Sequence, residues 1–124
     1  MTPEQLKEFK QTHIAGWNER DRSKRDALLG KIYAQDITMY DSNTVFDGLK
    51  AISDFVGQLH TQDPDFHFYS DNPMEGLQDS IRFFGKIRTG QGILNSMDFF
   101  LLENGKAAHL YAFLDPEKVV GSIK

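Results

Sequence analysis

Asp98 is the residue whose place in the sequence most strongly suggests chemistry. It follows Met97 and precedes the apolar run Phe99 to Leu102, inside a segment that reads as a β-strand, where aspartate is disfavoured. Because burying a lone carboxylate is costly, this side chain must find hydrogen-bond donors or stay protonated. Two interpretations stay open. Asp98 either ties the sheet together through a group such as Tyr111, or points into a pocket as a hydrogen-bond donor or general acid.

Asp41 and His13 are the other candidates for proton transfer. Asp41 ends an alternating segment and shares the parity of Met39, so it is either the start of an Asx turn or a general base at a pocket rim. His13 lies one helical turn from both Phe9 and Trp17 on an apolar stripe. It is either a satisfied core histidine or a neutral imidazole that donates to a substrate oxygen.

Other kinds of site are not favoured by the sequence. The four histidines are scattered and none pairs with another ligand on one helix face, so we expect neither a metal nor another cofactor. The chain has no cysteine, which excludes thiolate chemistry. Ser96 lacks the strand-to-helix turn of a nucleophile elbow. His109 shares a predicted strand face with Asp98, but lies near the hairpin end and ranks fourth.

Length and composition predict a single domain over residues 1–124. The 124 residues are 40% hydrophobic and include 10 phenylalanines, which suits one core and an aromatic-lined cavity for a small apolar molecule. A net charge of −4 argues against nucleic acid as a partner. No apolar run approaches the ~20 residues that span a bilayer, and the charged N-terminus does not resemble a signal peptide. We therefore expect a cytoplasmic protein with no membrane partner.

Hydrophobic periodicity predicts helices first and strands afterwards. The first helix should begin after the cap Thr2 and end near Arg20, the second should follow the cap Ser23 and include Tyr33, and the third should run over residues 49–59. Strands are expected over 37–41, from Phe66, and over 81–88, 93–102 and 107–114. This order predicts an α+β fold with the helices on one face of an antiparallel sheet.

Asn104 and Gly105 predict a two-residue hairpin turn between the last two strands. With an unbroken register, Asp98 lies opposite Tyr111, and Phe100 shares their face. The opposite face of this hairpin is also largely apolar. Because a lone domain rarely exposes so much apolar surface, we expect a homodimer packed through the sheet.

The order and spacing of many residues resemble the SnoaL-like branch of the nuclear-transport-factor-2-like (NTF2-like) superfamily. The matching residues are Trp17, Asn18, Glu19, Asp21, Arg25, Leu28, Tyr33, Ala34, Asp36, Asp41, Gly48, Ala51 and Ile52, then Asp98, Gly105, Lys106, Phe113, Leu114 and Asp115. The resemblance spans about residues 6–116. It implies a cone of strongly curved sheet, a cystatin-like roll, with three N-terminal helices plugging its wide end and frequent dimerisation through the sheet.

The resemblance also implies roles for three residues. Compared with the similar ketosteroid isomerases, Asp41 matches the position of their general base. Asp98 matches their protonated oxyanion-hole aspartate, and His13 matches their oxyanion-hole tyrosine. The superfamily hosts isomerases, cyclases, dehydratases and hydrolases that use no metal or organic cofactor, beside members that only bind or assemble.

Two functions follow as hypotheses. The first is a cofactor-independent acid–base enzyme acting on a small apolar carbonyl compound or epoxide, with Asp41 as the base and Asp98 and His13 as donors to an enolate-like oxygen. The alternative is a non-catalytic small-molecule-binding or dimerisation module. In both cases the residues expected to line the cavity are Trp17, Phe55, Phe83, Phe100, Tyr111 and Phe113.

Overall fold

The structure is a computed structural model, and it describes residues 1–115. Residues 117–124, whose role the sequence leaves open, lie outside the described residues. The elements in chain order are α1 (Pro3–Asn18), α2 (Arg22–Leu29), β1 (Tyr33–Tyr40), β2 (Val45–Asp47), α3 (Leu49–Gln62), β3 (His67–Tyr69), β4 (Glu75–Leu77), β5 (Ser80–Thr89), β6 (Gly92–Glu103) and β7 (Lys106–Asp115).

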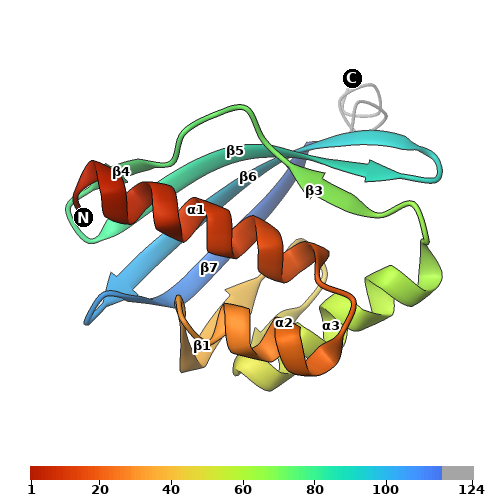
Figure 1. The fold of residues 1–124 in the computed structure, drawn as a ribbon, viewed down its shortest axis with the longest axis horizontal. Helices are drawn as coiled ribbons and strands as arrows, with labels where there is room; N and C mark the ends of the chain where they lie inside the picture. The colour runs from red at the N-terminus through yellow and green to blue at the C-terminus, as the bar shows by residue number, and fades with distance from the viewer. Residues whose placement is uncertain (116–124) are drawn as a thin grey trace.

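Within the described residues, seven strands form one curved sheet in the order β2-β1-β7-β6-β5-β3, and β4 also pairs with β5. Neighbouring strands are antiparallel except for the parallel pair β1 and β7. Figure 1 shows α1 crossing in front of the long strands β5, β6 and β7, with α2 and α3 below them near β1. The predicted α+β class, a curved and mostly antiparallel sheet with three helices, is confirmed.

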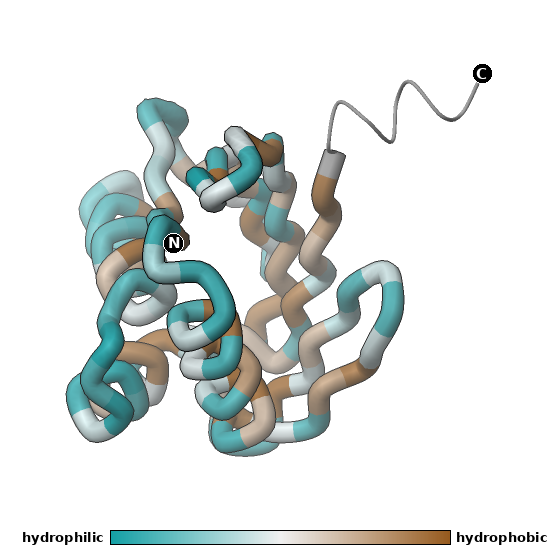
Figure 2. Tube along the Cα trace, turned by 90° about the vertical axis from the view of Figure 1, so that its right-hand side faces the viewer, coloured by the Kyte–Doolittle hydropathy of each residue, from teal (hydrophilic) through white to brown (hydrophobic). Residues whose placement is uncertain are grey.

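The core lies between the helices and the inner face of the sheet. Its largest fully buried side chains include Tyr33, Phe83, Phe100, Ile37 and Leu110. Figure 2 shows hydrophobic stretches recurring along the strands, whereas the helices alternate between hydrophobic and hydrophilic positions. No helix among residues 1–115 is long and apolar enough to cross a bilayer.

The start of α1 follows the sequence prediction, because Thr2 and Gln5 form a reciprocal capping box. The prediction for the second helix was wrong at both ends. Its N-cap is Asp21, whose side chain accepts from the backbone of Lys24, and the helix ends at Leu29. Tyr33 instead begins β1, because pairing with β7 overrides the local helical pattern.

The β6–β7 turn is as predicted, but the register beyond it is not. Asn104 and Gly105 both have positive φ, 54° and 80°, as a tight hairpin turn requires. The pairing then shifts, so that Leu102 pairs with Ala107 while Leu101 pairs with His109.

This shift leaves Ala108 without a pairing partner on β6. From there on, each side chain of β7 points to the opposite face of the sheet from the one predicted. Asp98 therefore lies opposite Ala112, and the predicted pair with Tyr111 was wrong. A bulge of this kind also bends its strand, which helps the sheet to curl around the helices. The inner face of β7 consequently carries Leu110, Ala112 and Leu114.

Candidate active site

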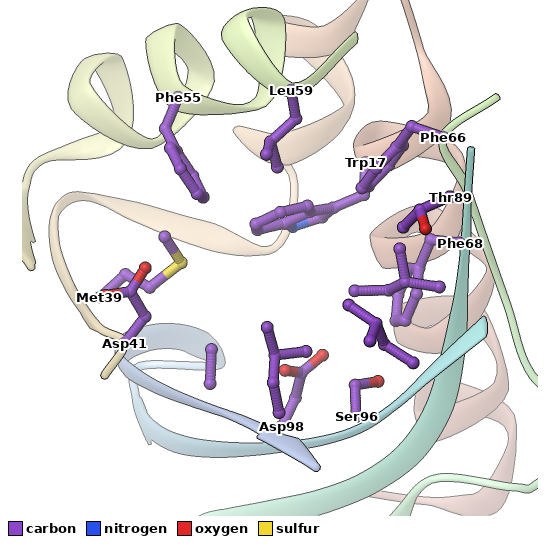
Figure 3. Close-up of a pocket in the computed structure, with 14 residues that line it drawn as sticks. Trp17, Met39, Asp41, Phe55, Leu59, Phe66, Phe68, Thr89, Ser96 and Asp98 are labelled. Carbon is purple, nitrogen blue, oxygen red and sulfur yellow. The ribbon is translucent and has the colours of Figure 1, made fainter. Parts of the chain in front are cut away.

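A cavity of about 160 Å³ lies between the inner face of the sheet and the helices. Trp17, Phe55 and Leu59 line its helical side, and Ser96 and Asp98 project from β6 on the opposite side (Figure 3). The size matches a ligand of about one ring, since a cavity of ~150 Å³ holds benzene. The site is largely apolar, as small-molecule pockets usually are.

The polar side chains at the cavity are few, and two of them are acidic. Asp41, Thr89, Ser96 and Asp98 line it together with the indole of Trp17. None of the residues described around the cavity is a lysine or an arginine. Among residues 1–115, no three His, Cys, Asp or Glu side chains come together as a metal site.

Asp98 is buried and forms a hydrogen bond with an imidazole. Its side chain extends from β6, and its Oδ2 lies 3.0 Å from Nε2 of His13 on α1. His13 is only 1% exposed and does not line the cavity. Its ring is enclosed by those of Phe68 and Phe100, which approach edge to face at 5.3 and 5.0 Å. The imidazole therefore lies behind Asp98, on the side away from a ligand.

The imidazole continues into a chain of buried hydrogen bonds. Nδ1 of His13 lies 2.7 Å from the hydroxyl oxygen of Tyr33, and that oxygen accepts the indole N–H of Trp17 at 2.8 Å. The indole can only donate. If the Tyr33 hydroxyl donates to Nδ1, then Nε2 carries the ring proton and donates to the Asp98 carboxylate. Every donor is then satisfied.

The alternative proton placement leaves a buried donor unpaired. If Nδ1 carried the proton, the Tyr33 oxygen would accept two hydrogen bonds and its own hydrogen would have no partner. Such an orphaned group costs about 1–3 kcal/mol. Burial raises the pKa of the Tyr33 phenol well above its ordinary value, and the charge of Asp98 adds to this effect. The phenol therefore keeps the proton that it donates to His13.

The pKa of Tyr33 predicts a specific loss of stability at alkaline pH. Above pH ~10 the unfolded chain releases the phenolic proton while the folded state retains it, so alkali stabilises the unfolded state. This single group should lower the free energy of unfolding by up to about 1.4 kcal/mol per pH unit above that value. Urea denaturation between pH ~9 and ~11 should show this slope in the wild type and a smaller slope in Tyr33→Phe; equal slopes would contradict it.

Asp41 forms the predicted Asx turn and also lies at the cavity, while its role as a general base stays a prediction. Its Oδ1 accepts the backbone N–H groups of Asn43 and Thr44 at 2.8 and 2.7 Å, which forms the Asx turn. The half-buried residue also lines the cavity with Asp98. The structure thus brings Asp41 and Asp98 to one cavity, with His13 behind the second of them.

Of the six residues expected to line the cavity, only Trp17 and Phe55 do so. Phe83 and Phe100 are fully buried and pack against His13, so they form the core beside the cavity. Placing Tyr111 and Phe113 in the cavity was wrong, because the bulge turns both to the outer face.

Sequence reasoning also missed two residues that matter here. Tyr33 was assigned to a helix, which hid its place in the hydrogen-bond chain. Ser96 was set aside as a nucleophile, although its parity with Asp98 on one strand already placed both side chains on the same face.

Comparisons with solved structures agree with this architecture. A candidate isomerase of the SnoaL-like family from Agrobacterium tumefaciens superposes with a TM-score of 0.80 at 23% identity, covering 90% of this chain and 98% of that one. The chain has the fold of the SnoaL-like and NTF2-like proteins. The predicted resemblance is thus confirmed by structure, whereas no protein-family model and no curated protein matches the sequence.

Two further structures show how broadly the NTF2-like fold is used. A ketosteroid isomerase-like protein from Catenulispora acidiphila, in complex with trimethylamine, has a TM-score of 0.70 at 12% identity over 84% of this chain and 82% of that one. A de novo designed protein with a curved β-sheet has a TM-score of 0.71 at 16% identity over 99% and 97%. The fold alone therefore carries no activity.

Proposed function

We propose that this protein is a cofactor-independent enzyme that transfers a proton on a small apolar carbonyl compound or epoxide. The observation that carries the proposal is the hydrogen-bond chain from Trp17 through Tyr33 and His13 to Asp98, which ends at a carboxyl group facing the cavity. A packing scaffold gains little from such a chain, because burying polar groups requires complete pairing.

The hydrogen-bond directions favour Asp98 as the base. The neutral imidazole of His13 donates to Oδ2 and fixes the carboxylate, and Oδ1 has no partner among residues 1–115. On a ketone, Asp98 would take a proton from the carbon next to the carbonyl. The C–H electron pair forms a C=C bond and the carbonyl electrons move to oxygen, giving an enolate. On a β,γ-unsaturated ketone the product of this step is a dienolate, and returning the proton to its γ-carbon shifts the C=C bond and completes an isomerisation.

These roles differ from the sequence hypothesis, in which Asp41 was the base and Asp98 and His13 were donors. In the proposal His13 acts by positioning Asp98. Asp41, which directly follows β1, also lines the cavity and would be the second acid–base group. With an epoxide, Asp98 would remove a proton from water as the water attacks carbon, and the epoxide oxygen would take a proton from a second water as the C–O bond breaks.

Deuterium exchange tests this proposal without knowledge of the natural substrate. Cyclopentanone, cyclohexanone and 2-cyclohexenone fit a cavity of about 160 Å³, and an enzyme that forms enolates should exchange their α-hydrogens with D₂O. Proton NMR should show exchange well above the rate in protein-free buffer for at least one of these ketones. For cyclohexene oxide the corresponding measurement is the rate of ring opening by water. The proposal would be contradicted if all three exchange rates and the ring-opening rate equal those in buffer.

A non-catalytic binding module is the second candidate, favoured by Asp41. Its Oδ1 is already engaged by two backbone N–H groups, as in a purely structural turn. The trimethylamine complex of a protein with the same fold supports small-molecule binding here without requiring chemistry. Binding of the ring ketones with no exchange would favour this candidate.

The proposed functional unit is a homodimer formed through the outer face of the sheet. That face exposes Phe84, Leu101 and Phe113 around Tyr40 and Tyr111, whose rings stack at 4.5 Å. An apolar surface of this kind is unusual in a monomer. Sedimentation should give a dimer for the wild type and a monomer for Leu101→Glu, while a monomeric wild type would contradict the assignment.

A further inference from the structure

Ser96 is a buried polar residue with no partner. It is only 7% exposed, and its Oγ makes no hydrogen bond to any of the described residues. The side chain nevertheless lines the cavity. Buried hydroxyl groups are nearly always paired, so the missing partner needs an explanation.

The neighbouring polar side chains of the cavity are already paired. Asp98 binds His13, the indole of Trp17 binds Tyr33, and the hydroxyl of Thr89 donates to the carbonyl of Gly92 at 2.8 Å. Ser96 is therefore the exception in a cavity whose other fixed donors are used within the protein.

The packing beside the Ser96 hydroxyl is tight on the side of β5, where the described residues offer it no partner. The residue that pairs with Ser96 in the backbone register of β5 and β6 is Gly85. A Cβ atom at Gly85 would lie 3.3 Å from Oγ of Ser96 and 2.9 Å from the ring of Phe68. Glycine at this position lets Phe68 and the hydroxyl sit close to the strand. Any larger residue would push against both.

Ser96 and Asp98 form a pair suited to a carbonyl compound. They are two residues apart on one strand face, so their Cα atoms are separated by about 6.6 Å. A ligand between them can place its oxygen at the hydroxyl and its neighbouring C–H bond at the carboxylate. The absence of lysine and arginine from the residues described around the cavity disfavours an anion, because two carboxyl groups repel it. The largely apolar lining favours a neutral ligand over a cation, because burying a charge is costly.

We infer that Ser96 is a ligand-binding residue that donates a hydrogen bond to the oxygen of a neutral, single-ring carbonyl compound. The inference rests on the proposed function for the location of the ligand, and it adds the donor that would stabilise the enolate oxygen. As Asp98 removes the α-proton, negative charge develops on that oxygen, and the Ser96 hydrogen bond strengthens without a proton being transferred.

A matched pair of ligands tests the inference by binding alone. Cyclohexanone and methylenecyclohexane have nearly the same shape, but only the ketone can accept a hydrogen bond. Trp17 lines the cavity and is the single tryptophan of the chain, so its fluorescence reports occupancy. Ser96→Ala should weaken cyclohexanone binding by about five- to tenfold and leave methylenecyclohexane unchanged.

Thr89→Val is the control, because it removes a cavity hydroxyl that is already paired. It should alter the affinities for the two ligands by the same factor. If Ser96→Ala changes both affinities equally, or neither, the inference is overturned while the proposed enzyme stands. Failure of both compounds to bind the wild type would contradict the ligand cavity and therefore both proposals. Ser96-dependent ketone binding without α-exchange would support the inference and count against the enzyme.

Discussion

Replacing Asp98 with asparagine is expected to lower the rate of α-hydrogen exchange on the ring ketones by about 100-fold or more, the usual contribution of a general base. Asparagine has nearly the same shape, and its carbonyl oxygen can still accept the Nε2–H of His13, which lies 3.0 Å from Oδ2 in the wild type. The substitution therefore removes basicity while the hydrogen-bond chain is kept. Exchange would be followed by proton NMR in D₂O.

Asp36→Asn provides the matched control for this substitution. Asp36 is exposed on β1, outside the residues that line the cavity, so its replacement changes the same chemical group without touching the site. It should exchange ketone hydrogens at the wild-type rate. An Asp98→Asn rate within about threefold of wild type, far less than a general base contributes, would remove Asp98 from the role of base.

His13→Ala is expected to lower the free energy of unfolding by about 3–5 kcal/mol. The imidazole is 1% exposed and contacts three phenylalanine rings, so its removal leaves a cavity in the core. The same change strips Asp98 of its donor and the Tyr33 hydroxyl of its acceptor. Two losses thus combine, one of packing and one of polar pairing. Urea denaturation followed by circular dichroism measures the result.

His67→Ala is the comparison for this stability measurement. His67 is exposed on β3, and a surface substitution of this kind usually changes stability by no more than ~0.5 kcal/mol. A loss below about 1.5 kcal/mol for His13→Ala, outside the range for buried deletions, would show that the imidazole is not a structural link between α1 and β6.

Local sequence signals predicted those parts of the fold that are determined locally. The capping box at Thr2 and Gln5 and the positive φ angles of Asn104 and Gly105 depend only on neighbouring residues. The end of α2 depends on the pairing of β1 with β7, which are far apart in the chain. The bulge at Ala108 is a break in the pairing of β7 with β6. No periodicity within a single segment contains that information.

The candidate site was predicted to a similar extent. Asp98 was identified because an acid in an apolar strand conflicts with local preference, and such conflicts tend to mark functional positions. The Tyr33 hydroxyl escaped notice because its strand was taken for a helix. The sequence placed Ser96 on the same strand face as Asp98, but its unpaired hydroxyl could not be recognised, since the absence of a hydrogen-bond partner is visible only when the surrounding residues have been placed.

This chain shares its fold with a designed protein. The evidence for catalysis must therefore come from the polar groups of the cavity and not from the fold. A curved sheet with helices can be built for shape alone, so the cavity by itself does not imply catalysis. In this chain a carboxyl group lines an apolar cavity and is paired with a buried imidazole behind it. The central claim of the proposal is that this imidazole is neutral and donates to the carboxylate.

Nitrogen NMR of the His13 imidazole at neutral pH tests this claim most directly. The chemical shifts of the two ring nitrogens distinguish the two neutral tautomers from each other and from the doubly protonated ring. We predict a neutral ring with the proton on Nε2 and none on Nδ1, as required if His13 donates to an ionised Asp98. A proton on Nδ1, alone or together with one on Nε2, would contradict this hydrogen-bond chain and the basis for Asp98 as the base.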